Sequence, residues 1–174
     1  GNGGALNENG YDSCISYFDG DIITDENIEY DDTSDTNNIL IYNHDNSNND
    51  YTEYTVNLEE GYYDILIVAG GGGGGGRHGA GGGGGGIIYL ENQALISGDY
   101  DISVGNGGNG GGAGSSPGYS GKDSEFNNLI AIGGGGGSSY DHTTTKNGGS
   151  GGGSSSNGGN GGLGTVGQGY NGGK

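Results

Sequence analysis

Two runs of glycine separated by only four residues constrain this chain more than any other feature. The stretch AGGGGGGGRHGAGGGGGGIIY, residues 69–89, places seven consecutive glycines before Arg77 and six more before Ile87. Runs of this kind can form a flexible linker, a phosphate-binding loop or an ordered extended layer. The choice among these three structures decides the fold and, through the fold, the function.

A flexible linker is the first possibility, because glycine loses more backbone entropy on folding than any other residue. However, the runs directly abut two strongly apolar segments, ILIVA at 65–69 and IIYL at 87–90, with no polar spacer. Apolar strands on both sides must pack against something, and they hold the ends of the glycine runs in place. The sequence therefore favours an ordered structure over a tether.

A nucleotide-binding loop is the second possibility, because DILIVAGGGGGG and DISVGNGGNG each place G-x-G-x-x-G after a strand-like run. The dinucleotide fingerprint requires a helix to begin at the glycines. The segments that follow, RHGAGGGGGG and GGAGSSPG, cannot start a helix. GYSGKD at 118–123 also lacks the spacing of a Walker A loop. We therefore expect no nucleotide site.

The third possibility is an ordered layer of polyglycine II helices. Such a helix rises about 3.1 Å per residue, so seven residues span about 22 Å, the length of a β-strand. Its N–H and C=O groups point outward and need partners when they are buried. Tracts that could pack side by side occur at 70–76, 81–86, 105–112, 133–137, 148–153 and 158–164. We expect 70–76 and 81–86 to be antiparallel rods joined by a tip at Arg77 and His78.

Strand patterns dominate the rest of the chain, and no 3.6-residue periodicity persists. In YTEYTVNL, residues 51–58, the even-numbered positions form an apolar face opposite a polar one. We expect strands at 14–18, 21–24, 38–42, 51–58, 64–70, 86–90, 99–105 and 128–133, with turns at 59–63 and 97–100. The sequence predicts an all-β fold, a jelly-roll or tumour-necrosis-factor-like β-sandwich with ordered polyglycine II helices and essentially no α-helix.

Charge and glycine usage divide the chain into two regions of one integrated domain. Residues 1–64 form an acidic N-terminal β region with six glycines, sixteen of the 22 Asp and Glu residues, and no Lys or Arg. Residues 65–174 form a glycine-rich β region with 43 of the 49 glycines, six acids and all four basic residues. The charges of −16 and −2 sum to −18. Such a field repels nucleic acid and anionic membranes, and we expect neither as a partner.

The order of motifs also resembles a known family. GYYDILIVAGGGGGGG, GAGGGGGGIIYLENQALISGDYDISVGNGGNGG and GKDSEFNNLIAIGGGGG, within 54–137, resemble the glycine-rich domains of bacteriophage and giant-virus tail or surface fibre proteins. More distantly, the chain is similar to polyglycine II adhesin tips and to the glycine-rich domain of anaplastic lymphoma kinase, whose cysteines it lacks. The resemblance implies an extracellular structural or host-recognition module that is not an enzyme.

Candidate binding residues are tip and loop side chains. Arg77 and His78 stand at the turn between two glycine tracts, where they could contact a partner or simply keep the turn soluble. The remaining candidates are tyrosines outside the expected strands, a residue type used for adaptable recognition and carbohydrate stacking: Tyr119, Tyr140 and Tyr170.

Metal and cofactor chemistry has little support in the sequence. DDTSD at 31–35 and HDNSNND at 44–50 are rich enough in oxygen ligands for a structural Ca²⁺, with Asp31, Asp35, Asp45 and Asp50 as candidate ligands. Neither has the glycine and terminal Glu of an EF-hand loop. Cys14 is the only cysteine, and His44 and His142 have no ligand companions at zinc spacing. We expect no other cofactor and no catalytic site.

These observations lead us to expect a structural subunit of an extracellular or virion-surface fibre that associates with copies of itself. The alternative is a receptor-binding adhesin that recognises glycans or proteins of a host surface. No apolar run approaches the roughly 20 residues that a membrane-spanning helix needs, so we expect no membrane insertion.

Overall fold

β-Strands are the only regular secondary structure in the described part of the chain. The structure is a computed structural model that describes residues 13–18, 38–45, 47 and 49–174. The strands are β1 (Ser13–Phe18), β2 (Asn38–Asn43), β3 (Tyr51–Leu58), β4 (Gly61–Val68), β5 (Ile87–Leu95), β6 (Gly98–Gly105), β7 (Ser124–Phe126) and β8 (Leu129–Ala131). The prediction of an all-β chain is confirmed for these residues. None of them forms a helix that is long and apolar enough to cross a membrane.

The strands expected from alternation are present, with shifted ends. β4 begins at Gly61, inside the predicted turn at 59–63, rather than at Asp64, and β5 continues to Leu95, beyond the apolar run that predicted it. β7 was not expected, because its sequence SEF is short and polar. The expected strand at 21–24 lies outside the described residues.

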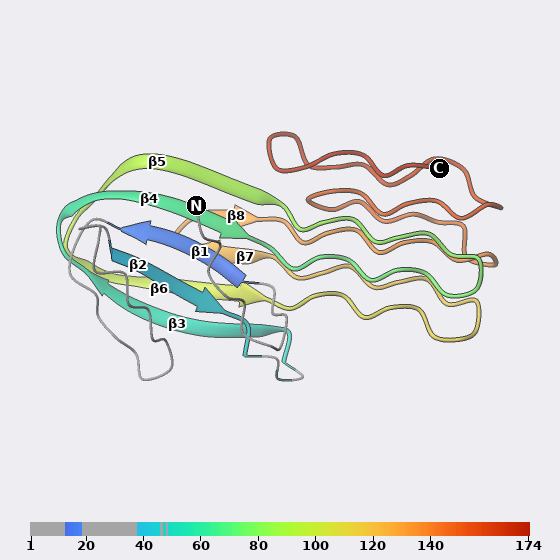
Figure 1. Cartoon of the computed structure of the whole chain (residues 1–174), viewed down its shortest axis with the longest axis horizontal. Helices are drawn as coiled ribbons and strands as arrows, with labels where there is room; N and C mark the ends of the chain where they lie inside the picture. Colours follow the sequence, from blue (N-terminus) through green and yellow to red (C-terminus); the bar gives the residue numbers. More distant parts are fainter. Residues whose placement is uncertain (1–12, 19–37, 46, 48) are drawn as a thin grey trace, which may run out of the picture.

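The strands form two antiparallel four-stranded sheets that pack face to face (Figure 1). The strand orders are β2-β1-β4-β5 and β3-β6-β7-β8. Alternation decides which face is buried: Tyr63, Ile65 and Ile67 of β4 point inward, while their neighbours along the strand are more exposed. The core that the two sheets share consists of Val56, Leu58, Tyr63, Ile65, Ile67, Ala69, Ile102, Val104, Phe126 and Ala131.

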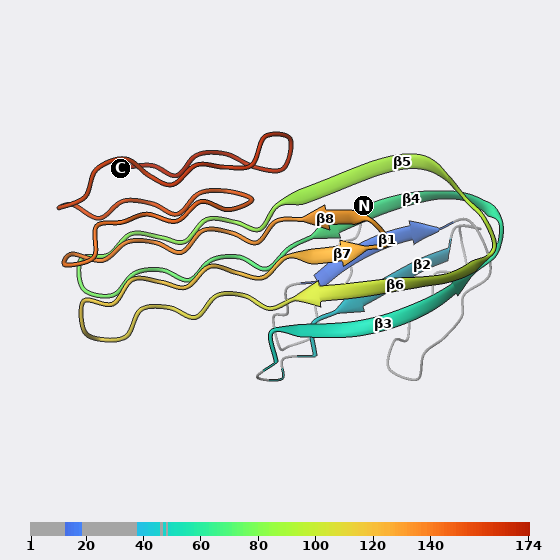
Figure 2. The ribbon, with the colours of Figure 1, turned by 180° about the vertical axis from the view of Figure 1, so that it is seen from behind.

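At one end of the sheets, long glycine-rich excursions take the place of loops (Figures 1 and 2). β4 continues into 69–76, which turns and returns through 80–86 to β5. β6 continues into 105–112 and returns through 116–123 to β7, and β8 continues into 132–139 and the remainder of the chain. We call residues 69–86, 105–123 and 132–173 together the glycine bundle.

Main-chain hydrogen bonds hold the glycine bundle together with a repeat of three residues. Along 69–76, every third N–H group donates to the antiparallel segment 80–86: Ala69 to Gly86 (3.0 Å), Gly72 to Gly83 (2.8 Å) and Gly75 to Ala80 (2.8 Å). The N–H group one residue later donates to another segment, 116–122: Gly70 to Lys122, Gly73 to Tyr119 and Gly76 to Ser116. Three residues per turn is the repeat of the polyglycine II helix. The expected antiparallel rods joined at Arg77 and His78 are confirmed.

Close approach, rather than backbone conformation, is why the bundle needs glycine. Positive φ angles among the described glycines occur only at Gly98 and Gly167, so an L-residue could adopt the backbone of the tracts. Space is what is missing. In the buried central segment, a Cβ atom at any residue of 133–137 would overlap a neighbouring carbonyl oxygen. In the peripheral segment 116–122, only Gly118 and Gly121 meet that restriction, and the other positions carry side chains.

A side-chain amide fastens the C-terminal part of the bundle to the sheets. Oε1 of Gln168 accepts the N–H of Ile132 at 2.8 Å, and its Nε2 donates to the carbonyl oxygen of Ile130 at 2.9 Å. The main-chain oxygen of Gln168 accepts the N–H of Ile87 at 3.1 Å. One residue thus bonds to β5, to β8 and to the residue that follows β8.

Candidate functional site at the tip of the glycine bundle

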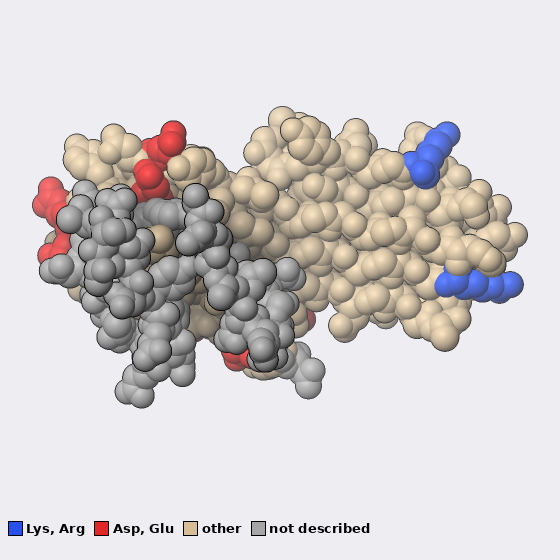
Figure 3. Space-filling view, viewed as in Figure 1, with Lys and Arg blue, Asp and Glu red and all other residues tan. Residues whose placement is uncertain are grey.

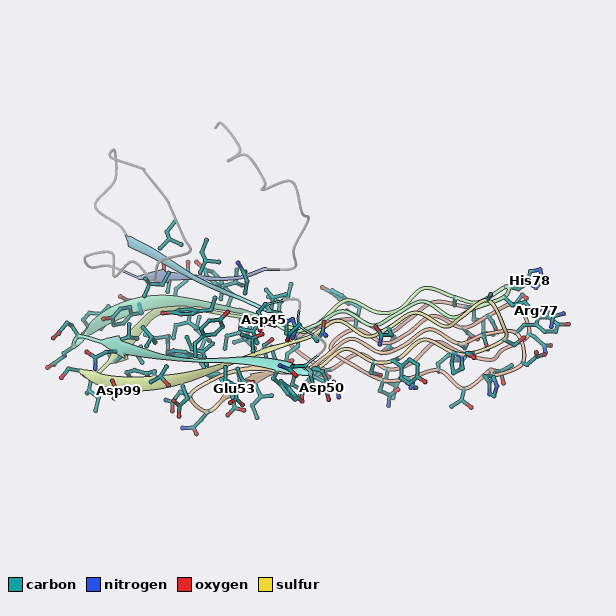
Figure 4. The ribbon with its side chains drawn as sticks, turned by 90° about the horizontal axis from the view of Figure 1, so that it is seen from below. Asp45, Asp50, Glu53, Arg77, His78 and Asp99 are labelled. Atoms are coloured by element: carbon teal, nitrogen blue, oxygen red, sulfur yellow. The ribbon has the colours of Figure 1, made fainter. Side chains whose placement is uncertain are left out.

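Three turns meet at the far end of the glycine bundle, which we call the tip: residues 77–79, 113–115 and 140–142 (Figure 4). The N–H of Tyr140 donates to the carbonyl oxygen of Arg77 at 3.3 Å, and Nη1 of Arg77 donates to Oγ of Ser115 at 3.5 Å. Oγ of Ser139 donates to the carbonyl oxygen of Ser115. These contacts bring together residues that are 24 or more positions apart in the sequence.

Tyr140 is the centre of the side-chain cluster at the tip. The guanidinium carbon of Arg77 lies 5.7 Å from the ring centroid of Tyr140, a cation–π contact. The ring of His78 lies 5.9 Å from the same centroid in an edge-on arrangement. Nη1 of Arg77 is 3.7 Å from Oδ2 of Asp141. Cation, aromatic ring, imidazole and carboxylate therefore share one exposed end of the molecule.

The backbone at the tip favours glycine, yet it carries two large side chains. Arg77 and His78 have φ angles of 36° and 50°, in the left-handed region that residues other than glycine seldom occupy. Holding a non-glycine residue there costs roughly 1–3 kcal/mol. The turn therefore holds two non-glycine residues in a chain that supplies glycine at almost every neighbouring position.

The groups at the tip remain available to a partner. The side chains of Arg77 and Asp141 are 57% and 53% exposed, so their ion pair is weak and easily exchanged. Figure 3 shows Lys and Arg at the far end of the glycine bundle and Asp and Glu over the strand-forming half. The tip therefore lies at the less acidic end of the molecule.

Two of the five candidate residues from the sequence lie away from the tip. Tyr119 belongs to segment 116–122, where Nζ of Lys146 lies 5.3 Å from its ring centroid. Tyr170 lines a hollow of about 430 Å³ together with Ile87 and Tyr89 of β5 and Gln168. Tyr170 is 85% exposed and Tyr89 is 53% exposed, so two accessible rings border this hollow. The structure thus brings Arg77, His78 and Tyr140 together and separates Tyr119 and Tyr170 from them.

The calcium candidates that the structure describes bind to other groups. Oδ1 of Asp45 accepts the N–H of Ser47 at 2.9 Å, and bonds to Ser47 hold the pKa of Asp45 below its usual value. Oδ2 of Asp50 pairs with Nζ of Lys122 at 2.8 Å, a hydrogen bond that raises the pKa of Lys122. Asp31 and Asp35 lie outside the described residues. Within the described ranges, no three His, Cys, Asp or Glu side chains gather as metal ligands would.

An acidic hollow on the outer face of the second sheet was not anticipated from the sequence. It measures about 650 Å³, and the acids that line it are Glu53 of β3, Asp99 and Asp101 of β6, and Glu125 of β7. Thr55 and Asn57 donate hydrogen bonds to Asp101 and Asp99 from the paired strand. The acids occupy alternate positions of their strands, and this alternation is the sequence signal that would have placed them on one face of the sheet.

A side-chain-free surface lies on the outer layer of the bundle, formed by segments 80–86, 69–76 and 105–112. Its outward positions are Gly71, Gly74, Gly81, Gly84, Gly107 and Gly110, and we call this surface the bare face. A Cβ atom at Gly81 or Gly84 would meet nothing within 4 Å, and one at Gly74 would lie 3.6 Å from its nearest neighbour. Figure 4 shows this layer at the upper side of the bundle, almost without side chains up to the labelled tip.

The main chain of the bare face is also incompletely paired. The carbonyl oxygens of Gly71 and Gly74 accept the N–H groups of Gly108 and Gly111. The N–H groups of Gly71, Gly74, Gly84 and Gly110, in contrast, have no hydrogen-bond partner within the part of the chain that the structure describes. Outward donors thus recur at intervals of three residues.

These features define a class of protein: a β-sheet module whose excursions at one end form a glycine bundle with an exposed tip. Its family follows from the sequence, because the family described as "Glycine-rich domain" matches residues 46–174. The chain belongs to this glycine-rich domain family. No curated protein and no solved structure matches the chain.

Proposed function

We propose that this protein is a non-enzymatic structural subunit of an extracellular or virion-surface fibre or filament, and that its copies associate through the bare face. The observation that carries the proposal is glycine at positions where the single chain does not require it. Gly74, Gly81 and Gly84 have room for a side chain, and each glycine costs roughly 0.5–1 kcal/mol of backbone entropy relative to alanine. A partner that approaches the main chain closely accounts for this cost.

A second copy is the partner that suits such a surface. Unpaired donors at every third residue match carbonyl oxygens that repeat at the same interval. The bare face supplies such acceptors at Gly107 and Gly110, whose carbonyl oxygens accept no bond within the described residues. Inside the bundle, segment 132–139 packs on 69–76 in this way, through bonds from Gly134 to Gly70 and from Gly137 to Gly73. The bare face carries no charge, so copies with a net charge of −18 can meet there with least repulsion.

Three rods about 22 Å long present a contact well below the roughly 800 Å² per partner of a standard protein interface. Association of free subunits should therefore be weak and should grow with concentration and with salt, which screens the acidic halves. Sedimentation velocity over a concentration series, with negative-stain microscopy of the same samples, tests this expectation. A protein that stays monomeric at every concentration and salt level contradicts the proposal.

Variants separate association from folding. Gly74→Asn and Gly84→Asn place side chains into open space on the bare face, so the unfolding midpoint should hold while association is lost. Gly159→Asn is the matched control, because a Cβ atom there also meets nothing within 4 Å, but the residue lies outside the bare face. If all three variants associate like the parent chain, the bare face is not the interface.

A second candidate function, that of a receptor-binding adhesin, is favoured by the tip. Arg77 and His78 occupy strained backbone and flank the ring of Tyr140, an arrangement suited to acidic or neutral sugars. Binding to a glycan array by the parent protein, and its loss in Arg77→Ala and Tyr140→Ala, tests this function. An array without any binder counts against it for glycans.

The finer structural class is part of the same proposal. The eight strands of the described residues, in two four-stranded antiparallel sheets, match the strand count of a jelly roll, and we place the sheets in the jelly-roll or tumour-necrosis-factor-like class. The proposed function requires no cofactor. A structural Ca²⁺ near Asp31 and Asp35 would reveal itself as a rise in the unfolding midpoint on addition of calcium that chelation reverses.

A further inference from the structure

Asn-Gly dipeptides recur through the glycine bundle and are chemically reactive. They begin at Asn106, Asn109, Asn147, Asn157, Asn160 and Asn171. An asparagine followed by glycine is prone to cyclise, because the glycine nitrogen carries no neighbouring Cβ that hinders its attack on the side-chain amide carbon. Two conditions must be met: the glycine N–H must be free to lose its proton, and the asparagine side chain must be free to turn toward it.

Asn147 fails both conditions. Its Oδ1 accepts the N–H of Leu163 at 2.7 Å, and the N–H of the following Gly148 donates to the carbonyl oxygen of Leu163 at 3.1 Å. Leu163 therefore holds both reacting groups in place. Cyclisation at Asn147 requires two hydrogen bonds to break before the attack can begin.

Asn171 and Asn157 are restrained in the same way. At Asn171, Oδ1 accepts the N–H of Gly164 (2.9 Å) and Gly172 donates to Gly162 (2.8 Å). At Asn157, Nδ2 donates to the carbonyl oxygen of Tyr140 (3.4 Å) and Gly158 donates to Ser155 (2.8 Å). Asn106 is restrained only at its side chain, where Nδ2 donates to the carbonyl oxygen of Asn49 at 3.2 Å.

Asn109 and Asn160 meet both conditions. Within the described residues, neither side chain makes a hydrogen bond, and the N–H groups of Gly110 and Gly161 have no acceptor. Both asparagines are exposed, so water reaches them. Their main-chain oxygens accept single bonds, from the N–H of Tyr119 at 2.9 Å and from Oγ1 of Thr145 at 3.2 Å.

We propose that Asn109 and Asn160 are sites of spontaneous deamidation, and that the fold protects Asn147, Asn157 and Asn171. The deprotonated nitrogen of Gly110 or Gly161 forms a bond to Cγ of the preceding asparagine, the Cγ–Nδ2 bond breaks, and ammonia leaves. Water then opens the succinimide ring at either carbonyl, giving aspartate or isoaspartate. No oxidant, metal or enzyme is required, and each event adds one negative charge at neutral pH.

Isoaspartate at position 109 has a structural consequence. The N–H groups of Gly108 and Gly111 bond to the carbonyl oxygens of Gly71 and Gly74 at 2.8 and 2.7 Å. Segment 105–112 and segment 69–76 each advance three residues between these two bonds, and Asn109 lies between the two bonded residues of segment 105–112. Isoaspartate routes the chain through the side-chain carbon and adds one backbone atom to that segment only. The two bonds then lose their common register, so deamidation at Asn109 loosens segment 105–112, which forms one edge of the bare face.

Peptide mapping by mass spectrometry tests the proposal on the folded protein incubated at mildly alkaline pH. Asn109 and Asn160 should gain about 1 Da, with isoaspartate assigned by fragmentation, at least about tenfold faster than Asn147, Asn157 and Asn171. A tenfold difference in rate corresponds to about 1.4 kcal/mol, which is no more than the net free energy of two hydrogen bonds. Asn106 should fall between the two groups.

Two controls make each outcome decisive. In urea the rates at the six Asn-Gly pairs of the bundle should converge, because the unfolded chain presents them as equivalent sites. Asn109→Gln should abolish the mass change at position 109 and leave that at Asn160 unaltered. Equal rates at all six sites in the folded protein, faster reaction at Asn147 or Asn171, or no reaction at Asn109 and Asn160 while the urea sample reacts would each overturn the proposal.

Discussion

Replacement of Gly73 by alanine should destabilise the protein strongly, whereas the same change at Gly74 should not. A Cβ atom at Gly73 would overlap the carbonyl group of Asn109 and would come within 2.7 Å of the carbonyl oxygen of Gly108. Both are main-chain atoms, which cannot rotate away as a flexible side chain can. At Gly74, the nearest atom is the carbonyl oxygen of Ala80 at 3.6 Å, an ordinary van der Waals contact.

The magnitude follows from the hydrogen bonds that the displacement breaks. Segment 105–112 must move away from 69–76, which puts at risk the bonds from Gly108 to Gly71 and from Gly111 to Gly74. At about 1 kcal/mol net for each of the two bonds, with about 1–3 kcal/mol for overpacking, the free energy of unfolding should fall by about 3–5 kcal/mol. Alanine at Gly74 should leave it unchanged or raise it by up to about 1 kcal/mol, because the unfolded chain loses entropy.

Urea denaturation followed by circular dichroism and by tyrosine fluorescence measures the difference. The chain has 13 tyrosines and no tryptophan, so tyrosine emission reports on the whole molecule. In thermal unfolding, Gly73→Ala should lower Tm by roughly 6–20 °C. If both alanine variants unfold at the same urea concentration, close packing does not explain the glycines, and the tract behaves as a tether.

Three further predictions concern single side chains. Gln168→Ala removes the bonds of the side-chain amide to Ile130 and Ile132 and leaves the N–H of Ile132 without its acceptor. The free energy of unfolding should therefore fall by about 1–3 kcal/mol, and 165–173 should become sensitive to limited proteolysis. Burial raises the pKa of Tyr63 above its usual value of 10.0, so the contribution of the neutral phenol to folding stability is fully present below pH 10.0 and is lost as the pH rises above it. Tyr63→Phe removes this ionisation and should raise the pH midpoint of alkaline unfolding. Arg77→Ala should change Tm by less than about 2 °C, since its ion pair is exposed.

The strands and the central glycine segments could be predicted from sequence for a clear physical reason. Alternation identifies β3 and β6, and the run at 133–137 is all glycine because that segment is surrounded on every side. The segment 116–122 was missed as a rod, although Gly118 and Gly121 stand three residues apart. A peripheral rod needs glycine only where it faces a neighbouring segment. Its sequence signal is therefore glycine at every third position and not an uninterrupted run of glycines.

The candidate site was predictable only in part. Arg77 and His78 follow from their position between two tracts, but the sequence does not place Tyr140 beside them. That contact depends on the turns at 77–79 and 140–142 reaching the same distance from the sheets, which the lengths of two separate excursions determine. Gln168 was also missed, because a polar residue between glycines carries no sign that its amide will bond to Ile130 and Ile132.

The two halves of the molecule should respond differently to temperature. The sheets bury apolar side chains such as Ile65 and Val104, whose exposure on unfolding raises the heat capacity. The glycine bundle buries peptide groups and few apolar atoms, and exposure of polar surface lowers the heat capacity. Its stability should therefore vary little between cold and warm conditions, while the sheets lose hydrophobic stabilisation on cooling. Calorimetry of the whole chain should give a heat-capacity change well below that of an ordinary domain of 174 residues.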